Sequence, residues 1–299
     1  MAHSKRRFLL KISDLTDGEV VDICRSALER PPVATALDPQ KPAVGLLFTE
    51  PSTRTRISFE RAAQRLGRST ILVDAKTTSL EKGETMADTL LNLRALQVSS
   101  FVIRTSETGS LEELRDIEGI GVVNAGDGIG EHPTQALLDF TTLLKAYGGD
   151  PKRLNGLRLG ILGDLKRSRV AHSWSELAPR FGIKLMLISP ESWKPDWASG
   201  FDWTDDKKRV LPDLDVLMAL RIQKERMSNS LQSGEASAFV ERFHVRASDL
   251  KPSQKLMHPG PVNWGLELNP DLRGDPRSLI LDQVEAGLAV RSAVLEFLG

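Results

Sequence analysis

The chain has 299 residues, which at about 150 residues per domain predicts two domains. Hydrophobic residues make up 40% of it and charged residues 27%, the composition of a globular protein with enough apolar material for a sizeable core. The 40 basic and 40 acidic side chains give a formal net charge of zero, which excludes a global field that would draw the protein to nucleic acid, and the single cysteine, Cys24, excludes an internal disulfide.

The N-terminal segment is basic up to Arg7 and is followed by a short apolar run from Phe8 to Leu10. That run is too short for the core of a signal peptide, and no apolar stretch elsewhere approaches the ~20 residues of a membrane helix. We therefore expect a soluble, cytoplasmic protein with no membrane partner, a location that the single cysteine also fits.

The first half of the chain alternates short apolar runs with amphipathic ones. Thr16 and Glu19 have the spacing of a capping box and predict a helix that carries apolar residues up to Leu28 and ends before the pair Pro31-Pro32. Further strands are expected at 43–48, 70–73, 99–103 and 121–124, and further helices at 57–66, at 85–96, from 110 and at 137–147.

A second series follows the linker-like stretch Gly148-Gly149-Asp150-Pro151. Its predicted strands are 157–162, 184–188, 215–219 and 255–257, and its predicted helices are 170–181, 236–243 and 283–298. This alternation is typical of α/β proteins in which helices cover a parallel sheet. The sequence thus predicts two α/β domains, each with a parallel sheet flanked by helices.

Hydroxyl and guanidinium groups crowd the segment Ser52-Thr53-Arg54-Thr55-Arg56, between a predicted strand and a predicted helix. The N–H groups of a helix N-terminus, together with bidentate arginines, suit a phosphate dianion. A hydroxyl-capped helix with arginines in solvent explains the same residues equally well. The pattern G-x-x-x-x-G-K-[ST] is absent, which argues against a nucleoside-triphosphate P-loop.

His132 follows a glycine-rich turn and precedes Pro133, which fits the first position of a helix. The helix dipole there disfavours the imidazolium form, and a neutral histidine can donate a hydrogen bond to a carbonyl oxygen. A histidine that only caps the helix is the competing interpretation. The spacing of Gly126, Gly128 and Gly130 differs from the fingerprint G-x-G-x-x-G, which argues against an NAD site.

Four further polar segments are candidates for a binding site. Lys82 lies in the loop 79–84, where it is either an anion clamp or a solvated cation. The basic segments 163–169 and 221–226 each follow a strand, where ligands of open α/β sheets gather, although charged loops are also common there. The segment 258–261, His-Pro-Gly-Pro, has the form of a rigid structural turn.

Several chemistries are excluded by missing patterns. There is no G-x-S-x-G, no H-E-x-x-H, and the five histidines show no metal-ligand spacing. What remains is a two-domain anion-binding protein rich in hydroxyl, arginine and histidine donors. Such donors suit the stabilisation of a developing oxyanion without a metal.

Two of these segments resemble motifs of the transcarbamoylases, the aspartate/ornithine carbamoyltransferase family. Residues 48–60, Phe-Thr-Glu-Pro-Ser-Thr-Arg-Thr-Arg-Ile-Ser-Phe-Glu, are similar to the carbamoyl phosphate motif, and residues 132–139, His-Pro-Thr-Gln-Ala-Leu-Leu-Asp, to the second motif. Ornithine enzymes typically carry His-Pro-Cys-Gln and a His-Cys-Leu-Pro turn, so the chain is similar to the aspartate branch. The loops 79–84, 163–169 and 221–226 match in the family's order, and the resemblance spans the chain from about Phe8 to its C-terminal helix.

The resemblance implies a domain division. Residues 1–135 would form a carbamoyl phosphate-binding domain, with the C-terminal helix 287–299 packed back on it, and residues 136–286 an aspartate-binding domain. It implies no metal and no organic cofactor.

Seven residues are implied to bind carbamoyl phosphate: Ser52, Thr53, Arg54, Thr55, Arg104, His132 and Gln135. Among them, Arg54 would neutralise the phosphate as it leaves. Thr55, Arg104 and His132 would surround the carbamoyl oxygen, and Gln135 would hold the carbamoyl amine.

Four residues are implied to bind L-aspartate: Lys82, Arg169, Arg221 and Gln223. Ser79 and Lys82 would reach into the site of a neighbouring subunit, which implies a homotrimer with shared active sites. Glu50, Arg169 and Arg226 resemble the charges that link the two domains when the enzyme closes.

The implied reaction is carbamoyl transfer from carbamoyl phosphate to the α-amino group of L-aspartate, the committed step of pyrimidine biosynthesis. Transfer to a different amine such as ornithine is the nearest rival hypothesis, but the cationic side chain of ornithine would be repelled by Arg169 and Arg221. A catalytically silent assembly subunit and a simple phosphate-binding module are two more distant hypotheses. Association with regulatory or dihydroorotase-like chains is left open.

Overall fold

The computed structural model describes residues 8–29, 36–74, 83–222 and 239–299. The chain divides into two compact units, residues 1–141 with 285–299, and residues 142–284. The divisions fall inside α4 (Pro133–Ala146) and α8 (Ile280–Leu298), whereas we expected them at 135 and 286. The first turns of α4 belong to the first unit because the Leu137 carbonyl accepts hydrogen bonds from Thr141 and from Cys24 of α1 (Asp17–Glu29).

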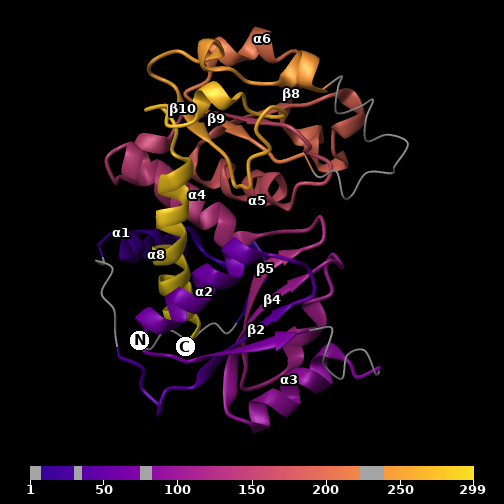
Figure 1. Ribbon diagram of the computed structural model, residues 1–299, viewed down its shortest axis with the longest axis vertical. Helices are drawn as coiled ribbons and strands as arrows, with labels where there is room; N and C mark the ends of the chain where they lie inside the picture. Colours follow the sequence, from indigo (N-terminus) through magenta and orange to yellow (C-terminus); the bar gives the residue numbers. More distant parts are fainter. Residues whose placement is uncertain (1–7, 30–35, 75–82, 223–238) are drawn as a thin grey trace. The chain divides into compact units, whose positions relative to one another are not determined.

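Five strands form the sheet of the first unit, in the order β1-β5-β4-β2-β3. They are β1 (Phe8–Leu9), β2 (Ala43–Phe48), β3 (Thr70–Asp74), β4 (Val98–Thr105) and β5 (Gly121–Asp127). Figure 1 labels the three inner strands of this sheet, β5, β4 and β2. Every pairing is parallel. The carboxyl ends of all five strands therefore lie at the same edge of the sheet.

Two helices of the first unit begin at capping signals in the sequence. In α1 the Thr16 N–H donates to Glu19 Oε2 at 2.7 Å, and the Glu19 N–H donates to Thr16 Oγ1 at 3.3 Å, which confirms the capping box. Thr85 caps α3 (Met86–Ala95) by accepting from the Asp88 N–H at 3.1 Å. The remaining long helix, α2 (Thr53–Arg65), follows β2 directly.

The core of the first unit lies on both faces of its sheet. Leu47, Phe101 and Ile103 pack with Leu90 of α3 on one face. The alternate positions of the same strands, such as Leu46 and Val102, point to the other face and are fully buried as well. A parallel sheet that is buried on both faces needs helices on both. The end of α8 packs in this unit against α2.

The second unit has a sheet of the same kind, in the order β10-β9-β6-β7-β8. Its strands, all paired in parallel, are β6 (Arg158–Leu162), β7 (Lys184–Ile188), β8 (Asp202–Thr204), β9 (Val216–Ala219) and β10 (Lys255–Met257). Its helices include α5 (Arg169–Leu177) and the short α6 (Lys207–Val210). Stacked rings of Trp193, Phe239 and Phe243 lie in its core, with centroids 5.2 and 5.3 Å apart.

The predicted fold class is confirmed: there are two parallel five-stranded sheets flanked by helices, and the C-terminal helix packs back on the first unit. The short strands β1 and β8 were not predicted. Within the described residues, no helix is both long and apolar enough to cross a lipid bilayer.

Candidate active site

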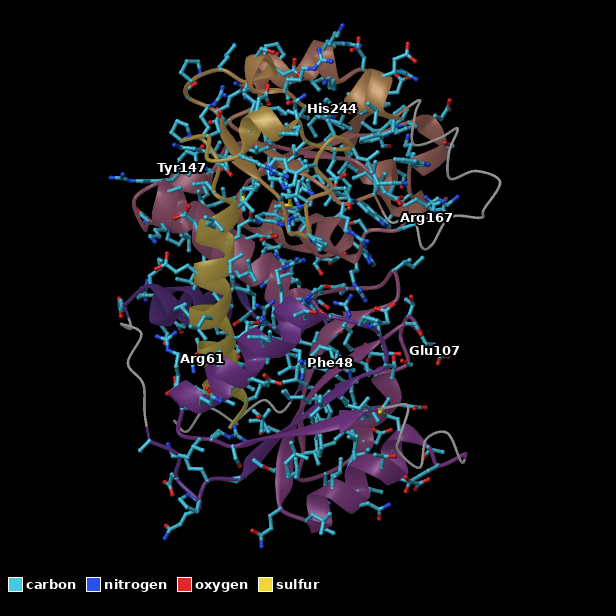
Figure 2. All side chains as sticks on the ribbon, viewed as in Figure 1. Phe48, Arg61, Glu107, Tyr147, Arg167 and His244 are labelled. Atoms are coloured by element: carbon cyan, nitrogen blue, oxygen red, sulfur yellow. The ribbon has the colours of Figure 1, made fainter. Side chains whose placement is uncertain are left out.

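Three strands of the first unit end side by side. Phe48, the last residue of β2, pairs with Arg104 of β4, and Thr105 at the end of β4 pairs with Asp127 at the end of β5. The Thr49 N–H donates to the Arg104 carbonyl at 2.9 Å and ties the first of these ends to the second. Figure 2 labels Phe48 at the end of β2. Three segments thus leave the sheet at one edge. One carries the predicted phosphate-binding residues, one carries Arg104, and one leads to His132.

The first of these segments forms the N-terminus of α2. Ser52 is the N-cap, and its carbonyl accepts from the Arg56 N–H at 3.1 Å. In the part of the chain that the structure describes, the Ser52 hydroxyl caps no helix N–H group. Thr53 and Arg54 are exposed, whereas Thr55 is 7% exposed. The positive end of the helix dipole and a guanidinium therefore occur together, as an anion site requires.

Arg104 is held in a partly buried ion pair at the end of β4. Its Nε lies 3.3 Å from Oε2 of Glu50, and both side chains are less than one-fifth exposed. Its Nη1 donates to the Ala125 carbonyl on the neighbouring strand at 3.4 Å. These contacts fix the direction of the guanidinium, which a catalytic donor needs if it is to act without reorganisation.

His132 is the residue before the first turn of α4, as we predicted. Its carbonyl accepts from the N–H groups of Gln135 at 2.9 Å and Ala136 at 3.2 Å, and its side chain is 4% exposed. Nδ1 of His132 lies 3.5 Å from Oγ1 of Thr134. Gln135 sits one turn further along and donates to Asp139 Oδ1 at 2.8 Å. Both predicted ligands of the carbamoyl group are therefore buried near the start of one helix.

A buried polar network that we did not predict fixes the loop before His132. Oδ1 of Asp127 accepts from the Asn124 side-chain amide and from the Glu131 N–H, and Oδ2 accepts from the Gly109 N–H, each at 2.8 Å. Gly128 has a φ of +45°, and a Cβ there would lie 2.8 Å from the Ser106 carbonyl. The only trace of this network in the sequence is a set of polar residues within and after an otherwise apolar strand.

The second unit positions two arginines at the edge of its own sheet. Leu162 at the end of β6 pairs with Ala219 at the end of β9, and Arg169 and Arg221 follow these two strands. Ser168 caps α5 by accepting from the Ala171 N–H at 3.1 Å, which leaves Arg169 as the first helical residue. Arg169 is 6% exposed and Arg221 is half-buried. Two guanidiniums in the segments that follow neighbouring strands suit a dicarboxylate.

Arg167, which precedes Arg169 and is labelled in Figure 2, has a different environment. Its Nη1 lies 3.1 Å from Oδ1 of the fully buried Asp164. This guanidinium is therefore engaged within the loop 163–169.

The turn at 258–261 follows β10 on the same edge of the second sheet. Nδ1 of His258 accepts from the Gly260 N–H at 2.8 Å, so the ring proton is on Nε2, which faces Oε1 of Glu267 at 3.3 Å. The same oxygen accepts from the Asn263 N–H at 3.0 Å. Both side chains are fully buried. The expected rigid turn is therefore held by Glu267, a residue that no sequence pattern indicated.

Some predicted site residues lie outside the described residues. These are Ser79, Lys82, Gln223 and Arg226. Among the residues that are described, no group of three or more His, Cys, Asp or Glu side chains is arranged to hold a metal ion.

The chain matches two models of one protein family. Residues 7–145 match the model described as aspartate/ornithine carbamoyltransferase, carbamoyl-P binding domain, and residues 155–298 match the Asp/Orn binding domain of the same family. Together the two models account for almost the whole chain.

Curated relatives and solved structures agree with these models. The aspartate carbamoyltransferase catalytic subunit of Thermus aquaticus is 43% identical over 277 residues, which cover 91% of this chain and 89% of the relative, and that of Opitutus terrae is 40% identical over 97% and 94%. The structure of Trypanosoma cruzi aspartate transcarbamoylase with carbamoyl phosphate and aspartate superposes with a TM-score of 0.86 at 29% identity, covering 99% of this chain and 97% of that one. The catalytic subunit of the M. jannaschii enzyme gives 0.83 at 27%, with coverage of 98% and 97%. This chain therefore belongs to the aspartate/ornithine carbamoyltransferase family.

Proposed function

We propose that the chain transfers the carbamoyl group of carbamoyl phosphate to the α-amino group of L-aspartate, giving N-carbamoyl-L-aspartate and phosphate, the committed step of pyrimidine biosynthesis. The observation that carries the proposal is the convergence of the α2 N-terminus, Arg104 and His132 at one edge of the first sheet. Relatives at 40 and 43% identity that are named aspartate carbamoyltransferase support aspartate as the acceptor.

The phosphate of carbamoyl phosphate would bind at the N-terminus of α2. The N–H groups of the first turn and the hydroxyls of Ser52, Thr53 and Thr55 are hydrogen-bond donors, and Arg54 supplies a full positive charge. The electrostatic stabilisation of the phosphate group by these donors grows as negative charge develops on its oxygens. The same groups therefore stabilise the phosphate more strongly when its bond to carbon breaks.

The carbamoyl group would face Arg104 and His132. The neutral α-amino nitrogen of aspartate attacks the carbonyl carbon, and the negative charge that develops on the oxygen is met by donors from Thr55, Arg104 and His132. The C–N bond forms, the C–O bond to phosphate breaks, and the nitrogen loses one proton to the departing phosphate. The side-chain carbonyl of Gln135, whose amide already donates to Asp139, is an acceptor for the carbamoyl amine.

L-Aspartate would be held by Arg169 at the start of α5 and Arg221 after β9, which follow two adjacent strands of the second unit. Each guanidinium can bind one carboxylate with two parallel hydrogen bonds. Gln223 and Lys82 complete the predicted set but lie outside the described residues. Two cations at this position favour a dicarboxylate over ornithine, because the ornithine side chain is itself a cation.

The protein would work as a homotrimer with shared active sites, in which Ser79 and Lys82 reach the site of a neighbouring subunit. This part of the proposal rests on the family resemblance of the loop 79–84. Mixing Lys82→Ala chains with Arg54→Ala chains tests it, since a mixed interface contains one intact copy of each residue. Recovery of part of the activity after subunit exchange supports shared sites, and complete inactivity of the mixture contradicts them.

Phosphate release from carbamoyl phosphate, measured above its spontaneous decay with L-aspartate or L-ornithine, tests the reaction. We expect a rate that saturates with aspartate only. Arg54→Ala should lower turnover at least about 10²-fold, since it removes a transition-state charge contact. Arg56→Ala is the matched control, because Arg56 is paired with Glu60 at 3.2 Å on the same helix. Saturation with ornithine instead, or equal losses in both variants, would contradict the proposal.

A further inference from the structure

The C-terminal helix places a guanidinium inside the first unit. Arg291 of α8 is 5% exposed, and the plane of its guanidinium lies near the ring of Phe59 of α2, with 5.2 Å between the guanidinium carbon and the ring centroid. Burial lowers the pKa of Arg291 to about 10, so the side chain is still a cation at neutral pH. Burying a cation is costly compared with burying an apolar side chain, and the proposed mechanism gives this residue no part.

Arg291 is connected to the phosphate-binding turn through one hydroxyl. Its Nη1 donates to Ser58 Oγ at 2.6 Å, and Ser58 Oγ lies 3.0 Å from the Thr55 carbonyl. Because a guanidinium can only donate, the single proton of the Ser58 hydroxyl is directed at that carbonyl. The position of the Thr55 backbone therefore depends on where Arg291 holds Ser58.

Two charged groups of the first unit act electrostatically on the Arg291 guanidinium. The Asp139 carboxylate is fully buried, accepts from Gln135 at 2.8 Å, and raises the pKa of Arg291 against the effect of burial. Arg54 acts on the same guanidinium in the opposite direction and lowers its pKa. The field of Arg291 thus extends to one residue of the proposed phosphate site and to the carboxylate that orients Gln135.

The helix leaves room for this guanidinium. A Cβ on Gly287, one turn earlier in α8, would lie 2.8 Å from Nη1 of Arg291 and 3.3 Å from a methyl group of Leu138. Glycine weakens a helix interior by roughly 0.5–1 kcal/mol relative to alanine. The missing side chain at Gly287 therefore leaves space for the Arg291 guanidinium, at a cost in helix stability.

We propose that Arg291 is a positioning residue that holds the phosphate-binding turn through Ser58. The inference rests on the proposed function, since that function assigns Thr55 to the binding of carbamoyl phosphate. Arg291 does not touch the substrate. Arg291 acts from the C-terminal helix, on the buried side of the turn that is proposed to bind phosphate.

The test compares Arg291→Met, Arg291→Lys and Ser58→Ala with Val290→Ala, a fully buried control on the same helix. Calorimetric titration gives the Kd of inorganic phosphate, and steady-state kinetics gives the KM values of both substrates. We expect Arg291→Met to raise the Kd of phosphate and the KM of carbamoyl phosphate about tenfold, with the KM of aspartate within about twofold of wild type. Arg291→Lys should recover part of the lost affinity for phosphate. Val290→Ala should lower the Tm without changing the Kd of phosphate or the KM of carbamoyl phosphate.

Ser58→Ala gives a second, milder measurement on the same connection. It should raise the Kd of phosphate about threefold, and combining it with Arg291→Met should add little, because both substitutions break one chain of hydrogen bonds. If Arg291→Met does not fold, Ser58→Ala decides the question alone.

Two outcomes overturn the inference. The first is an unchanged Kd of phosphate in folded Arg291→Met or in Ser58→Ala, and the second is an equal loss of phosphate binding in Val290→Ala. Failure of the proposed function has a different signature: wild-type chain that binds phosphate but produces no carbamoyl aspartate. In that case the phosphate affinities of the variants still decide whether Arg291 positions the turn.

Discussion

Replacing Asp127 with alanine removes the centre of the network before His132. Three donors, each at 2.8 Å from the carboxylate, lose this acceptor: the side-chain amide of Asn124 and the N–H groups of Glu131 and Gly109. The Asn124 amide keeps the Leu10 carbonyl at 2.9 Å as a partner, whereas the buried Glu131 N–H loses the acceptor of its side-chain contact. A buried donor left without a partner costs about 1–3 kcal/mol. Since water can reach the exposed Gly109 and the Asn124 amide keeps a partner, the loss comes mainly from the Glu131 N–H, and we expect a decrease of about 1–3 kcal/mol in the free energy of unfolding.

Two probes separate the effect on the first unit from any effect on the second. Cys24 is buried in the first unit, so its reaction with a thiol reagent in urea reports the unfolding of that unit. All five tryptophans lie in the second unit, so their fluorescence reports the other. With a slope of about 1–3 kcal/mol per molar urea, a loss of about 1–3 kcal/mol should lower the midpoint of thiol exposure in Asp127→Ala by about 0.3–3 M, or about 1 M for the middle of both ranges.

Asp22→Ala is the control for this experiment. Asp22 is 75% exposed and lies 3.6 Å from Arg25 on the surface of α1, an arrangement worth about 0.2–0.5 kcal/mol. If Asp127→Ala moves the midpoint of thiol exposure no further than Asp22→Ala does, the network does not hold the loop and the reasoning is wrong.

Three further outcomes are expected. His132→Ala should lower kcat by about 10²–10³ with the oligomeric state unchanged by size-exclusion chromatography, and wild-type turnover would refute the role of His132 as an oxyanion donor. Arg221→Ala should raise the KM of aspartate at least about tenfold while Arg242→Ala, on an exposed arginine paired with Asp205, leaves it unchanged; equal values for the two variants would contradict the assignment. Burial raises the pKa of the Cys24 thiol from 9.0 to about 12, so the stability that the protonated thiol contributes is complete below pH 9 and is lost as the pH rises toward 12. Native protein at pH 8 should therefore react with a thiol reagent far more slowly than unfolded protein. Equal rates would show that the thiol is accessible.

The elements that could be predicted carry strong local signals. The reciprocal bonds of Thr16 and Glu19 define the start of α1, and Pro133 begins α4 where its fixed φ is favourable. Strand β2 is a continuous apolar run, and β6 is one after its first residue, Arg158, because parallel strands are buried on both faces. The clusters of hydroxyl and arginine residues also stood out, since such groups directly after a buried strand mark the carboxyl edge of a sheet.

The elements that could not be predicted depend on contacts distant in sequence. Strand β1 has two residues, too few for any periodicity, and exists because Phe8 and Leu9 pair with β5. The ion pair of Arg104 and Glu50 joins residues from the ends of two strands. The contact of Arg291 with Ser58 spans 233 positions, so an arginine in an apolar helix gave no sign of its partner. Such pairings follow from the fold and are not encoded in a local pattern.

One measurement tests the proposed reaction most directly. Carbamoyl phosphate labelled with ¹³C is incubated with the protein and ¹⁵N-labelled L-aspartate, and the product is observed by NMR. We predict a one-bond ¹³C–¹⁵N coupling that appears at the rate of phosphate release, because the carbamoyl carbon becomes bonded to the α-amino nitrogen. Release of phosphate with the ¹³C label free of any coupling to nitrogen of aspartate would contradict carbamoyl transfer to this acceptor.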